Sequence, residues 1–523
     1  MASSWSRFRS KSREMLAAAL FLGVAPAGVA VSFPPKTAAV VGAGPAGLLT
    51  SIMLARRGWN VEVIDQLSAP LPPADPSWGV GERSYQLGLN GRGQRALAEY
   101  GCMERVDRYA ASVRGRLNFA ENGKPSFTLF KPPGEAGADK SYVTRVMQRD
   151  RLQACLLEEA RQYPRITIAH GRTCVGIDLS GEKPVLESAA VGGSGGSAAA
   201  DSTPRQLEAE LIVGADGISS KVRAALEADG SGRTRAVRFA EVNERRYKTI
   251  PLHPERVNGT RTDLGWGCRN KTLELGMDAL PTKEGTMVGV LLFKPESEAS
   301  ERLEQMEDAK EARAFFGEAL PGLLPYLDDA ELGRFARRPV GKLPSFQLVE
   351  GDLHRALPSG AVVLLGDAIK AVKPYFGQGA NSALEDCRIL GKCLDESAGE
   401  VPAAAAAFSE RRAEDARALV RISRSFDFPG RLGTLRFLLP LVVDANLHKL
   451  LPSLFSPPLL RAMQDGRWGF AQLQRRKRWE RLAQLTLGAV SALALAAAAK
   501  VLARMLPVAL AGAIRLLAAR AQL

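Results

Sequence analysis

Residues 361–394 read AVVLLGDAIKAVKPYFGQGANSALEDCRILGKCL. The apolar run 361–365 predicts a buried strand, which ends in a Gly-Asp turn that carries one carboxylate. A Gly-Gln-Gly step at 377–379 then leads into a helical pattern from about Asn381. Backbone N–H groups at such a helix start can point at an electron-rich ligand, and glycine lets the backbone touch a flat ring. Taken alone, the stretch also fits a sharp structural turn, so its interpretation depends on the rest of the chain.

A second glycine-rich turn lies near the start of the chain. A strand predicted at 37–41 runs into GAGPAG, residues 42–47, and a helical pattern follows. In this GxGxxG pattern Gly42 permits the tight turn, Gly44 lets the backbone approach a pyrophosphate, and Gly47 lets the helix pack on the strand. Strand, turn and helix occur in the order that dinucleotide binding requires.

Two carboxylates follow two further predicted strands. Asp65 stands after the strand 61–64, where its side chain can bind ribose hydroxyls. Asp216 stands in the Gly-Ala-Asp-Gly turn after the strand 211–213, where it can hold a ribose or ribityl hydroxyl. An Asp-Gly pair is also a common plain turn, so both interpretations of the second carboxylate remain open.

Composition and charge restrict the class of protein. The chain has 523 residues, of which 46% are hydrophobic and 24% are charged, which predicts a largely globular protein with more than one domain. The net charge of +14 is concentrated at the two ends, since residues 1–36 carry +4 and residues 461–523 carry +9. Basic ends around a nearly neutral body are typical of targeting or membrane segments and argue against a nucleic-acid groove.

Both ends of the chain support this interpretation. Residues 1–14 are rich in Ser, Arg and Lys and the apolar run 15–31 follows, which predicts a leader or, alternatively, an irregular tail. Near the other end, residues 482–499 contain no charged residue and would form a helix about 27 Å long. This length is at the lower limit for a membrane span, so a spanning helix, an interfacial helix and a core-packed helix all remain open.

The remaining segments give simpler predictions. A strand or hairpin is expected at 113–130, an amphipathic helix at 149–160, a flexible surface insertion at 180–206, a sheet-rich region at 247–344, a helix at 402–420, and helices in the apolar region 430–465. The six cysteines have neither CxxC nor zinc-ligand spacing, and we expect them to be mostly reduced and structural.

The three glycine-containing motifs, in this order, resemble those of the group A flavoprotein aromatic hydroxylases. Residues 214–223 (GADGISSKVR) resemble one motif of this group, and residues 364–386 resemble another. Residues 84–101 (SYQLGLNGRGQRALAEYG) and the basic-aromatic residues 468–490 resemble the kynurenine 3-monooxygenase family within this group. The resemblance runs from about residue 36 to residue 490.

The resemblance implies an α/β fold, with a Rossmann-type FAD-binding domain like that of para-hydroxybenzoate hydroxylase, an interleaved β-sheet substrate domain, and a C-terminal helical, membrane-associated region. The expected boundaries are 1–35 for the leader, 36–112, 145–235 and 345–400 for the FAD-binding domain, 113–144 and 236–344 for the substrate domain, 401–478 for the helical region, and 482–518 for the membrane-associated segment.

The resemblance also implies an enzyme with FAD as cofactor and NADPH as co-substrate, with NADH as the alternative. Reduced flavin would add O₂, and the resulting flavin hydroperoxide would hydroxylate an aromatic ring, with L-kynurenine as the expected substrate. The backbone N–H groups of Gly377, Gln378 and Gly379 in this chain are expected to stabilise negative charge on the reduced flavin. The residues expected to bind FAD are Gly42, Gly44, Ala46, Gly47, Asp65, Arg149, Asp216, Gly366, Asp367, Gly379, Ala380 and Asn381.

For the substrate, the family implies an arginine that holds a carboxylate, and Arg116 matches it best, with Arg114 next. Asn381 matches a pocket asparagine, while Phe130 stands where the family has a tyrosine. The lost hydroxyl leaves two alternatives open: a hydroxylase or epoxidase for another aromatic or a lipophilic membrane substrate, and a degenerate flavin-binding protein. No metal and no nucleic acid are expected. The family implies an organellar membrane, namely the mitochondrial outer membrane, or a plastid or secretory membrane if the leader is used.

Overall fold

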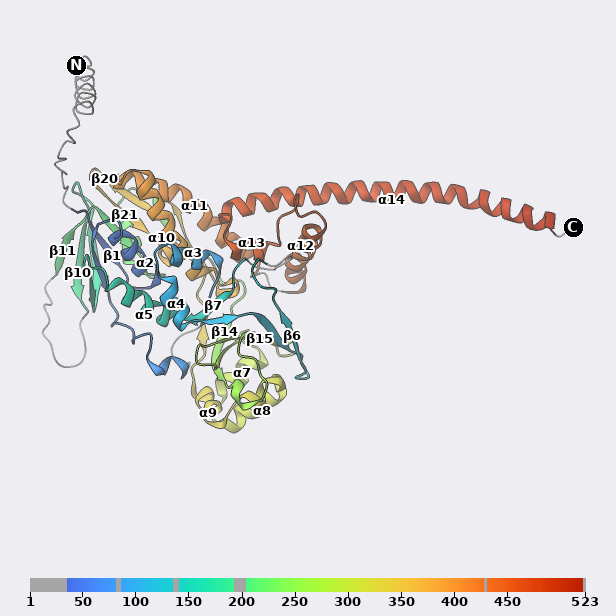
Figure 1. Ribbon diagram of the computed structural model, residues 1–523, viewed down its shortest axis with the longest axis horizontal. Helices are drawn as coiled ribbons and strands as arrows, with labels where there is room; N and C mark the ends of the chain where they lie inside the picture. Colours follow the sequence, from blue (N-terminus) through green and yellow to red (C-terminus); the bar gives the residue numbers. More distant parts are fainter. Residues whose placement is uncertain (1–34, 81–85, 135–140, 192–203, 428–429, 521–523) are drawn as a thin grey trace, which may run out of the picture. The chain divides into compact units, whose positions relative to one another are not determined.

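The computed structural model describes residues 35–80, 86–134, 141–191, 204–427 and 430–520. The leader expected at 1–35 therefore lies outside the described residues, except for its last position. The chain divides into two compact units, Met1–Lys36 and Thr37–Leu523, and the account below concerns the second (Figure 1).

A six-stranded sheet forms the centre of the larger core, with the strand order β20-β21-β12-β1-β2-β8. Its strands are β1 (Thr37–Val41), β2 (Asn60–Asp65), β8 (Ile166–His170), β12 (Leu211–Gly214), β20 (His354–Leu357) and β21 (Gly360–Leu364). All neighbours pair in parallel except β20, which is antiparallel to β21. The central strands are almost wholly apolar because both faces of the sheet are covered.

Seven helices from five parts of the described chain pack around this sheet and on one another. They are α2 (Pro45–Ala55), α3 (Gly91–Glu99), α4 (Met103–Tyr109), α5 (Arg149–Ala160), α6 (Lys221–Glu227), α10 (Gln378–Glu396) and α11 (Val401–Ser425). Helix α10 contacts α2, α3 and α11, while α11 contacts β21. The large core cluster runs through these elements, with Val40, Leu48, Val213, Val363 and Leu384 fully buried. The α/β fold class expected from the sequence is confirmed.

Three small sheets extend this core. They comprise β3 (Gln86–Leu89), β7 (Thr144–Gln148) and β4 (Ala111–Val113); β9 (Arg172–Asp178), β10 (Val185–Ala190) and β11 (Arg205–Glu208); and β13 (Thr234–Arg238), β19 (Gln347–Gly351) and β22 (Lys370–Ala371). Strand β10 lies inside the region 180–206 that was expected to be a flexible insertion, and β11 begins at its end, while residues 192–203 of that region lie outside the described residues. The expectation was too broad, because residues 185–190 pair with β9 along their length and bury alternate side chains.

A seven-stranded sheet forms the second core, in the order β18-β14-β17-β16-β15-β5-β6. Its strands are β5 (Gly115–Phe119), β6 (Pro125–Leu129), β14 (Arg246–Leu252), β15 (Leu264–Asn270), β16 (Leu275–Pro281), β17 (Met287–Phe293) and β18 (Gly341–Lys342). Between β17 and β18 the chain forms three helices, α7 (Glu298–Gln305), α8 (Ala309–Ala319) and α9 (Asp329–Arg337), which pack on one face of the sheet around Trp266 and Phe316.

The sequence prediction for 247–344 named only strands and missed these three helices. Their signal is in the capping residues, because Ser297, Asp308 and Asp328 each accept a hydrogen bond from the backbone N–H three residues later. Side-chain caps of this kind are a local helix-start signal, independent of the strand pattern around them.

The last part of the chain is helical, with α12 (Gly430–Leu450), α13 (Leu459–Asp465) and α14 (Phe470–Arg520), the long red helix in Figure 1. Within the described residues, one helix is long and apolar enough to cross a membrane, judged by length and composition alone. This is Phe470–Arg504 of α14, with a mean hydropathy of 1.9 in its apolar window. Every residue from Leu485 to Lys500 is exposed, so core packing does not account for this stretch.

Candidate functional site

Four chain segments that carry expected site residues meet at one edge of the six-stranded sheet. Strands β1, β2, β12 and β21 are adjacent and parallel, so their carboxyl ends lie side by side. These ends carry Gly42, Asp65, Asp216 and the Gly366-Asp367 turn. In open parallel sheets, ligands bind outside the carboxyl ends of the strands.

The first glycine-rich turn is packed so closely that only glycine fits at two positions. Gly42 has a φ of +103°, and a Cβ there would lie 2.5 Å from the backbone oxygen of Ala215 in the Gly-Ala-Asp-Gly turn. A Cβ on Gly47 would lie 1.8 Å from the backbone oxygen of Gly42. Gly44 then precedes α2, whose first turn contains no acidic residue. The N–H groups at this helix start are therefore suited to an anion such as a pyrophosphate.

Arg149, the first residue of α5, lies beside this turn. A Cβ on Gly44 would be 3.9 Å from Nη2 of Arg149, so the guanidinium faces the backbone that is expected to approach the phosphates. The Arg149 side chain is 46% exposed and contacts the Asp150 carboxylate at 3.4 Å. Its charge also opposes the pKa rise of Asp367, so it acts on both the first and the last motif. A cation in this position can pair with a phosphate.

The carboxylate of Asp65 stabilises the same turn by a hydrogen bond. Its Oδ2 accepts the N–H of Ala43 at 2.7 Å, and its Oδ1 accepts the N–H of Leu67 at 2.8 Å. A carboxylate has about four acceptor positions, so two remain for hydroxyl donors. Asp65 therefore has the geometry to hold a ribose while it fixes the loop.

Asp216 offers an acceptor that has no protein partner. Its Oδ2 accepts the N–H of Lys221 at 2.6 Å at the start of α6, but its Oδ1 is buried and has no hydrogen-bond partner among the described residues. Burial raises the pKa of the Asp216 carboxyl group, against the opposing effect of Ser220 and nearby backbone N–H groups. A buried acceptor without a partner is costly, and a ligand hydroxyl would satisfy it.

The third aspartate at the sheet edge, Asp367, is held on a turn that packs against α10. Gly366 has a φ of +60°, its N–H donates to Oδ2 of Asp386 at 3.0 Å, and a Cβ there would lie 3.0 Å from the Cβ of Ala383 and 3.8 Å from that of Ala46. Solvent reaches the Asp367 side chain. The protein around it nevertheless raises the pKa of its carboxyl group by desolvation, with Lys370 and Arg149 opposing the rise.

The start of α10 is open to a ligand. Gly377 precedes the helix in the left-handed conformation, with a φ of +60°, and the first turn of α10 contains no acidic residue. A Cβ on Gly379 would have no heavy atom within 4 Å, so open space lies in front of this backbone. N–H groups of residues 378–380 at the positive end of the helix dipole are suited to negative charge that develops on a ligand.

The side chain of Asn381 hydrogen-bonds to backbone groups of the protein, whereas the sequence predicted a contact with a ligand. Its Nδ2 donates to the backbone oxygens of Gly88 and Gly377, at 2.8 and 2.6 Å, and its Oδ1 accepts the N–H of Asn90 at 2.9 Å. The residue is 1% exposed. Asn381 thus positions the start of α10 against the segment between β3 and α3.

A buried ion cluster behind this turn was not anticipated from the sequence. Its six members are Arg92, Lys370, Glu385, Asp386, Arg412 and Asp415, and the structure pairs their charges directly. Arg412 binds Asp386 at 2.5 Å and Asp415 at 2.8 Å, while Lys370 binds Asp386 at 2.8 Å. Three positive and three negative groups balance, which a buried cluster requires. The only sequence signal is the Glu-Asp pair at 385–386 in the middle of the apolar part of α10.

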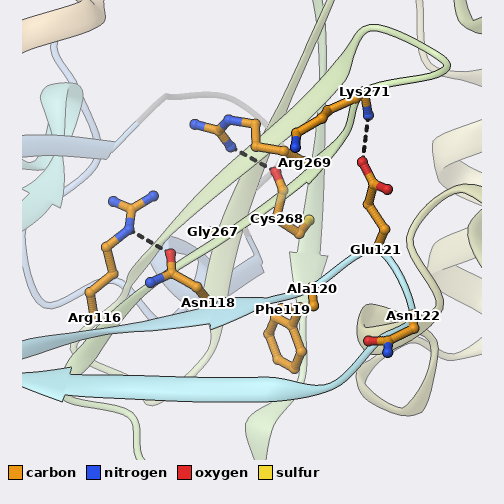
Figure 2. A pocket seen from close by; sticks show the side chains of 10 residues that line it. All are labelled: Arg116, Asn118, Phe119, Ala120, Glu121, Asn122, Gly267, Cys268, Arg269 and Lys271. Carbon is orange, nitrogen blue, oxygen red and sulfur yellow. Dashed lines mark hydrogen bonds between the residues drawn. The ribbon is translucent and has the colours of Figure 1, made fainter. Parts of the chain in front are cut away.

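Of the three expected substrate residues, Arg116 lies on the seven-stranded sheet and Phe130 directly follows its strand β6, whereas Asn381 lies on α10. Arg116 on β5 lines a pocket of about 680 Å³ together with Asn118 and Arg269, as Figure 2 shows. Its Nη2 binds Oδ1 of Asp278 at 2.5 Å and its Nε donates to Oδ1 of Asn118 at 2.9 Å. Arg269 binds the other oxygen of Asp278, also at 2.5 Å. A Cβ on Gly267 would lie 2.3 Å from Nη2 of Arg116, so this glycine makes room for the guanidinium.

Phe130 follows β6 directly, and its backbone N–H donates to the oxygen of Arg114 at 2.8 Å. Arg116 and Phe130 therefore belong to one hairpin, β5–β6, as the prediction for 113–130 required. Asp278, the partner of Arg116, and Arg269, the second arginine that binds Asp278, were not identified from the sequence, because they lie 162 and 153 positions away from Arg116 in the chain. The described residues contain no group of His, Cys, Asp and Glu that could hold a metal ion, and the six cysteines are free and buried.

Comparisons with known proteins agree with this geometry. A family model described as FAD binding domain matches residues 36–311 and 348–423, which is more than half of the chain. The matched ranges include β1, β2, β12 and β21, whose ends form the sheet edge described above.

Curated relatives and solved structures are similar over most of their length. The kynurenine 3-monooxygenase of Xanthomonas campestris pv. campestris (strain 8004) is 28% identical over 436 residues, which cover 81% of this chain and 86% of that protein. The kynurenine 3-monooxygenase of Stenotrophomonas maltophilia (strain K279a) is 27% identical and covers 82% and 87%. The tetrameric form of 2-methyl-3-hydroxypyridine-5-carboxylic acid oxygenase has a TM-score of 0.56 at 21% identity and covers 77% and 96%.

Proposed function

The chain belongs to the FAD-binding-domain family and is an FAD-dependent aromatic monooxygenase, and from this premise we propose that its substrate is L-kynurenine, hydroxylated to 3-hydroxykynurenine with NADPH as the reductant. The observation that carries the proposal is the Arg116–Asp278 pair, because Arg116 lines an open pocket and the half-exposed carboxylate of Asp278 is bound to its guanidinium. The relatives named kynurenine 3-monooxygenase support the same choice.

The residues at the sheet edge suit FAD as the cofactor. The turn at Gly42 to Gly47 and the guanidinium of Arg149 would hold the pyrophosphate, and Asp65 would hold the adenosine ribose. The buried, unpartnered Oδ1 of Asp216 and the accessible carboxylate of Asp367 would accept sugar or ribityl hydroxyls. Bound and reduced by the nicotinamide, FAD supplies the reaction with O₂ and the transfer of one oxygen atom to the aromatic ring.

The start of α10 would bind the edge of the flavin ring. Open space lies in front of the backbone at Gly379, in the first turn of this helix, so N–H groups of the first turn would stabilise negative charge on the ring without reorganising. The buried ion cluster and Asn381 act indirectly, since they fix α10 and the Gly366-Asp367 turn in place. They are positioning residues and would not touch the substrate.

Kynurenine is an amino acid, so its head group carries a carboxylate and an ammonium group. Arg116 would take the carboxylate, since its fork matches two oxygens, and Asp278 would take the ammonium group. Phe130, where the family has a tyrosine, supports a second candidate, namely another aromatic or a lipophilic substrate for the same flavin site. The exposed apolar part of α14 also favours that candidate.

We also propose that α14 attaches the protein to a membrane. Its apolar residues 485–499 are exposed, and the basic residues 475–478 precede them, as expected for a helix that leaves an anionic lipid surface. The organellar location expected from the sequence finds no support, because the named relatives are bacterial.

The decisive experiment measures NADPH oxidation by the FAD-loaded protein with and without L-kynurenine, and follows product mass and hydrogen peroxide together. Stimulated oxidation with a product 16 mass units heavier is the expected result. Peroxide without a heavier product would reject kynurenine and keep the monooxygenase, and a panel of other aromatic and lipophilic compounds would then be screened. The same assay with NADH in place of NADPH tests which of the two nucleotides is the reductant.

A further inference from the structure

We propose that the outer face of α12 rests on the lipid surface of a membrane, beside the point where α14 enters it. The inference rests on the membrane association proposed for α14 and adds a second contact from a different helix. Its starting point is an apolar stripe on α12 that nothing in the described part of the chain covers.

The α12 stripe consists of Leu435, Leu438, Leu439 and Val442, which are 60%, 49%, 56% and 57% exposed. Their spacing of three, one and three residues places them on one face of the helix. Single exposed leucines are common on soluble proteins, but a continuous apolar stripe marks an interaction surface. Three further leucines, Leu450, Leu451 and Leu454, are exposed where α12 ends.

The opposite face of α12 is tied to the protein. The ring centroid of Phe437 lies 3.7 Å from that of Phe426 and 6.5 Å from that of Phe376, which directly precedes Gly377. With 3.6 residues per turn, Phe437 and Asp444 both fall on the side away from the stripe. The stripe is therefore the outer face of a helix whose inner face contacts the segment before the flavin-binding start of α10.

Buried ion pairs then fix α12 to α14. Asp444 is fully buried and binds Lys477 at 3.0 Å, Arg481 at 2.8 Å and Gln484 at 3.1 Å, all on α14. Directly after Gln484, α14 becomes apolar and exposed on every side. Val442 precedes Asp444 by two residues, which is about 3 Å along the helix. The stripe thus lies close to the level at which α14 leaves the folded core.

The chemistry around the base of α14 favours lipid as the occupant of the stripe. Arg475 and Arg476 are 62% and 41% exposed, and Trp479 is 73% exposed. Exposed tryptophan and a basic cluster before an apolar helix are typical of a membrane–water interface. Each arginine near an anionic lipid surface also adds electrostatic attraction between the protein and that surface. A stripe held beside them would lie in the interface plane, as surface helices with one apolar face do.

The test places a fluorophore on the stripe of the full-length, FAD-loaded protein. All six natural cysteines are buried, so Leu439→Cys can be labelled selectively, and Glu104→Cys on α4, 90% exposed, gives a matched control. The vesicles contain phosphatidylcholine and phosphatidylserine, with bromine on the acyl chains as the quencher. We expect at least severalfold stronger quenching at 439 than at 104. Sedimentation with the same vesicles measures the association of α14 separately.

Each result has a distinct meaning. Protein that sediments with the vesicles while the label at 439 remains unquenched would overturn the stripe contact and leave the α14 anchor standing. Protein that does not sediment would overturn both. In the absence of vesicles, a dimer in which iodide does not quench the label at 439 would show that a second copy of the chain covers the stripe. This result would reject lipid as the occupant. In support, Leu438→Asp with Val442→Asp should reduce quenching at 439 severalfold with flavin content unchanged.

Discussion

Arg412 and Arg116 each bind an aspartate in this chain, but their surroundings are opposite. Arg412 and Asp386 are 1% and 0% exposed, whereas Arg116 and Asp278 are 44% and 41% exposed and the arginine lines a pocket. A buried pair has lost its hydration, so removing one partner leaves an uncompensated charge. An exposed pair keeps water nearby and contributes little to stability. The same two residue types therefore fix the fold in one place and are available to a ligand in the other.

The largest effect is expected from the buried pair. Asp386→Ala removes the partner of Arg412, of Lys370 and of the Gly366 N–H. Lys370 would remain buried without its carboxylate partner, and Arg412 would keep only Glu385 and Asp415. The free energy of unfolding should therefore fall by about 3–5 kcal/mol, as measured by urea denaturation. Asp278→Ala is the matched control and should cost less than about 1 kcal/mol. Equal costs for the two variants would remove the distinction between the two pairs, and Asp386→Asn provides a milder variant if the alanine protein is insoluble.

Lys248 extends the comparison, because it is a buried cation that binds backbone oxygens in place of a carboxylate. It is 2% exposed, and its Nζ donates to the backbone oxygens of Leu303 and Ala336 at 3.0 and 3.2 Å. Burial lowers the pKa of Lys248 to about 8 from 10.5, so between these values the unfolded chain binds more protons than the folded one. The free energy of unfolding contributed by Lys248 should therefore rise as pH increases from 8 to 10.5, by up to about 3 kcal/mol.

Unfolding of the wild type and of Lys248→Met across this pH range isolates the contribution. The difference between the two proteins should grow with pH in favour of the wild type. A difference that stays constant from pH 7 to pH 10.5 would show that the carbonyl partners keep the lysine charged in the folded state.

The Asp367 side chain is surrounded by protein groups but remains accessible to solvent. Its replacement is therefore expected to weaken ligand binding and to leave the stability of the fold unchanged. Asp367→Ala should weaken FAD about tenfold to a hundredfold, because one charge-assisted hydrogen bond is lost, and should give largely colourless protein. The flavin absorbance of the purified protein and a titration with FAD measure this. Asp395→Ala, which removes an exposed carboxylate paired with Arg57, is the control. Full flavin content in the Asp367 variant would count against its assigned role.

The smallest effect concerns the exposed pair itself. Arg116→Ala should weaken L-kynurenine about tenfold with FAD retained, since a partly solvated charge contact is lost. Arg313→Ala is matched in exposure at 42% and binds Asp329 on the helical side of the same domain. Calorimetric titration of the three FAD-loaded proteins gives the comparison. Unchanged affinity in the Arg116 variant, or an equal loss in the Arg313 variant, would contradict the substrate role.

The glycine turns were predictable because their information is local. At Asp216 and Asp367 a buried strand, a glycine in the left-handed conformation and the carboxylate lie within a few residues. At Gly42 the strand and the closely packed glycines are equally local, and the carboxylate of Asp65 stands at the end of the next strand. Parallel pairing then brings the strand ends together without further information from the sequence. The α/β fold followed from these same elements.

The ion cluster and the partners of Arg116 were not predictable for the opposite reason. Arg92 and Glu385 are 293 positions apart, and Arg116 and Asp278 are 162 apart, so no local pattern connects them. Asn381 was assigned to the ligand because it matches a pocket asparagine of the family, but its side-chain amide is hydrogen-bonded to the backbone of Gly88, Asn90 and Gly377. Which side chains a neighbour satisfies is decided only when distant segments meet.

Helix α14 has two parts that differ in purpose, and the division determines where the chain can be shortened. Phe470 and Leu473 belong to a core cluster, Arg92 stacks over the ring of Phe470 at 4.1 Å, and Asp444 reaches as far as Gln484. A cut at Arg478 would thus remove two of the partners of Asp444 and expose its charge. A cut just after Gln484 would spare every one of these contacts and remove the exposed apolar stretch that begins at Leu485.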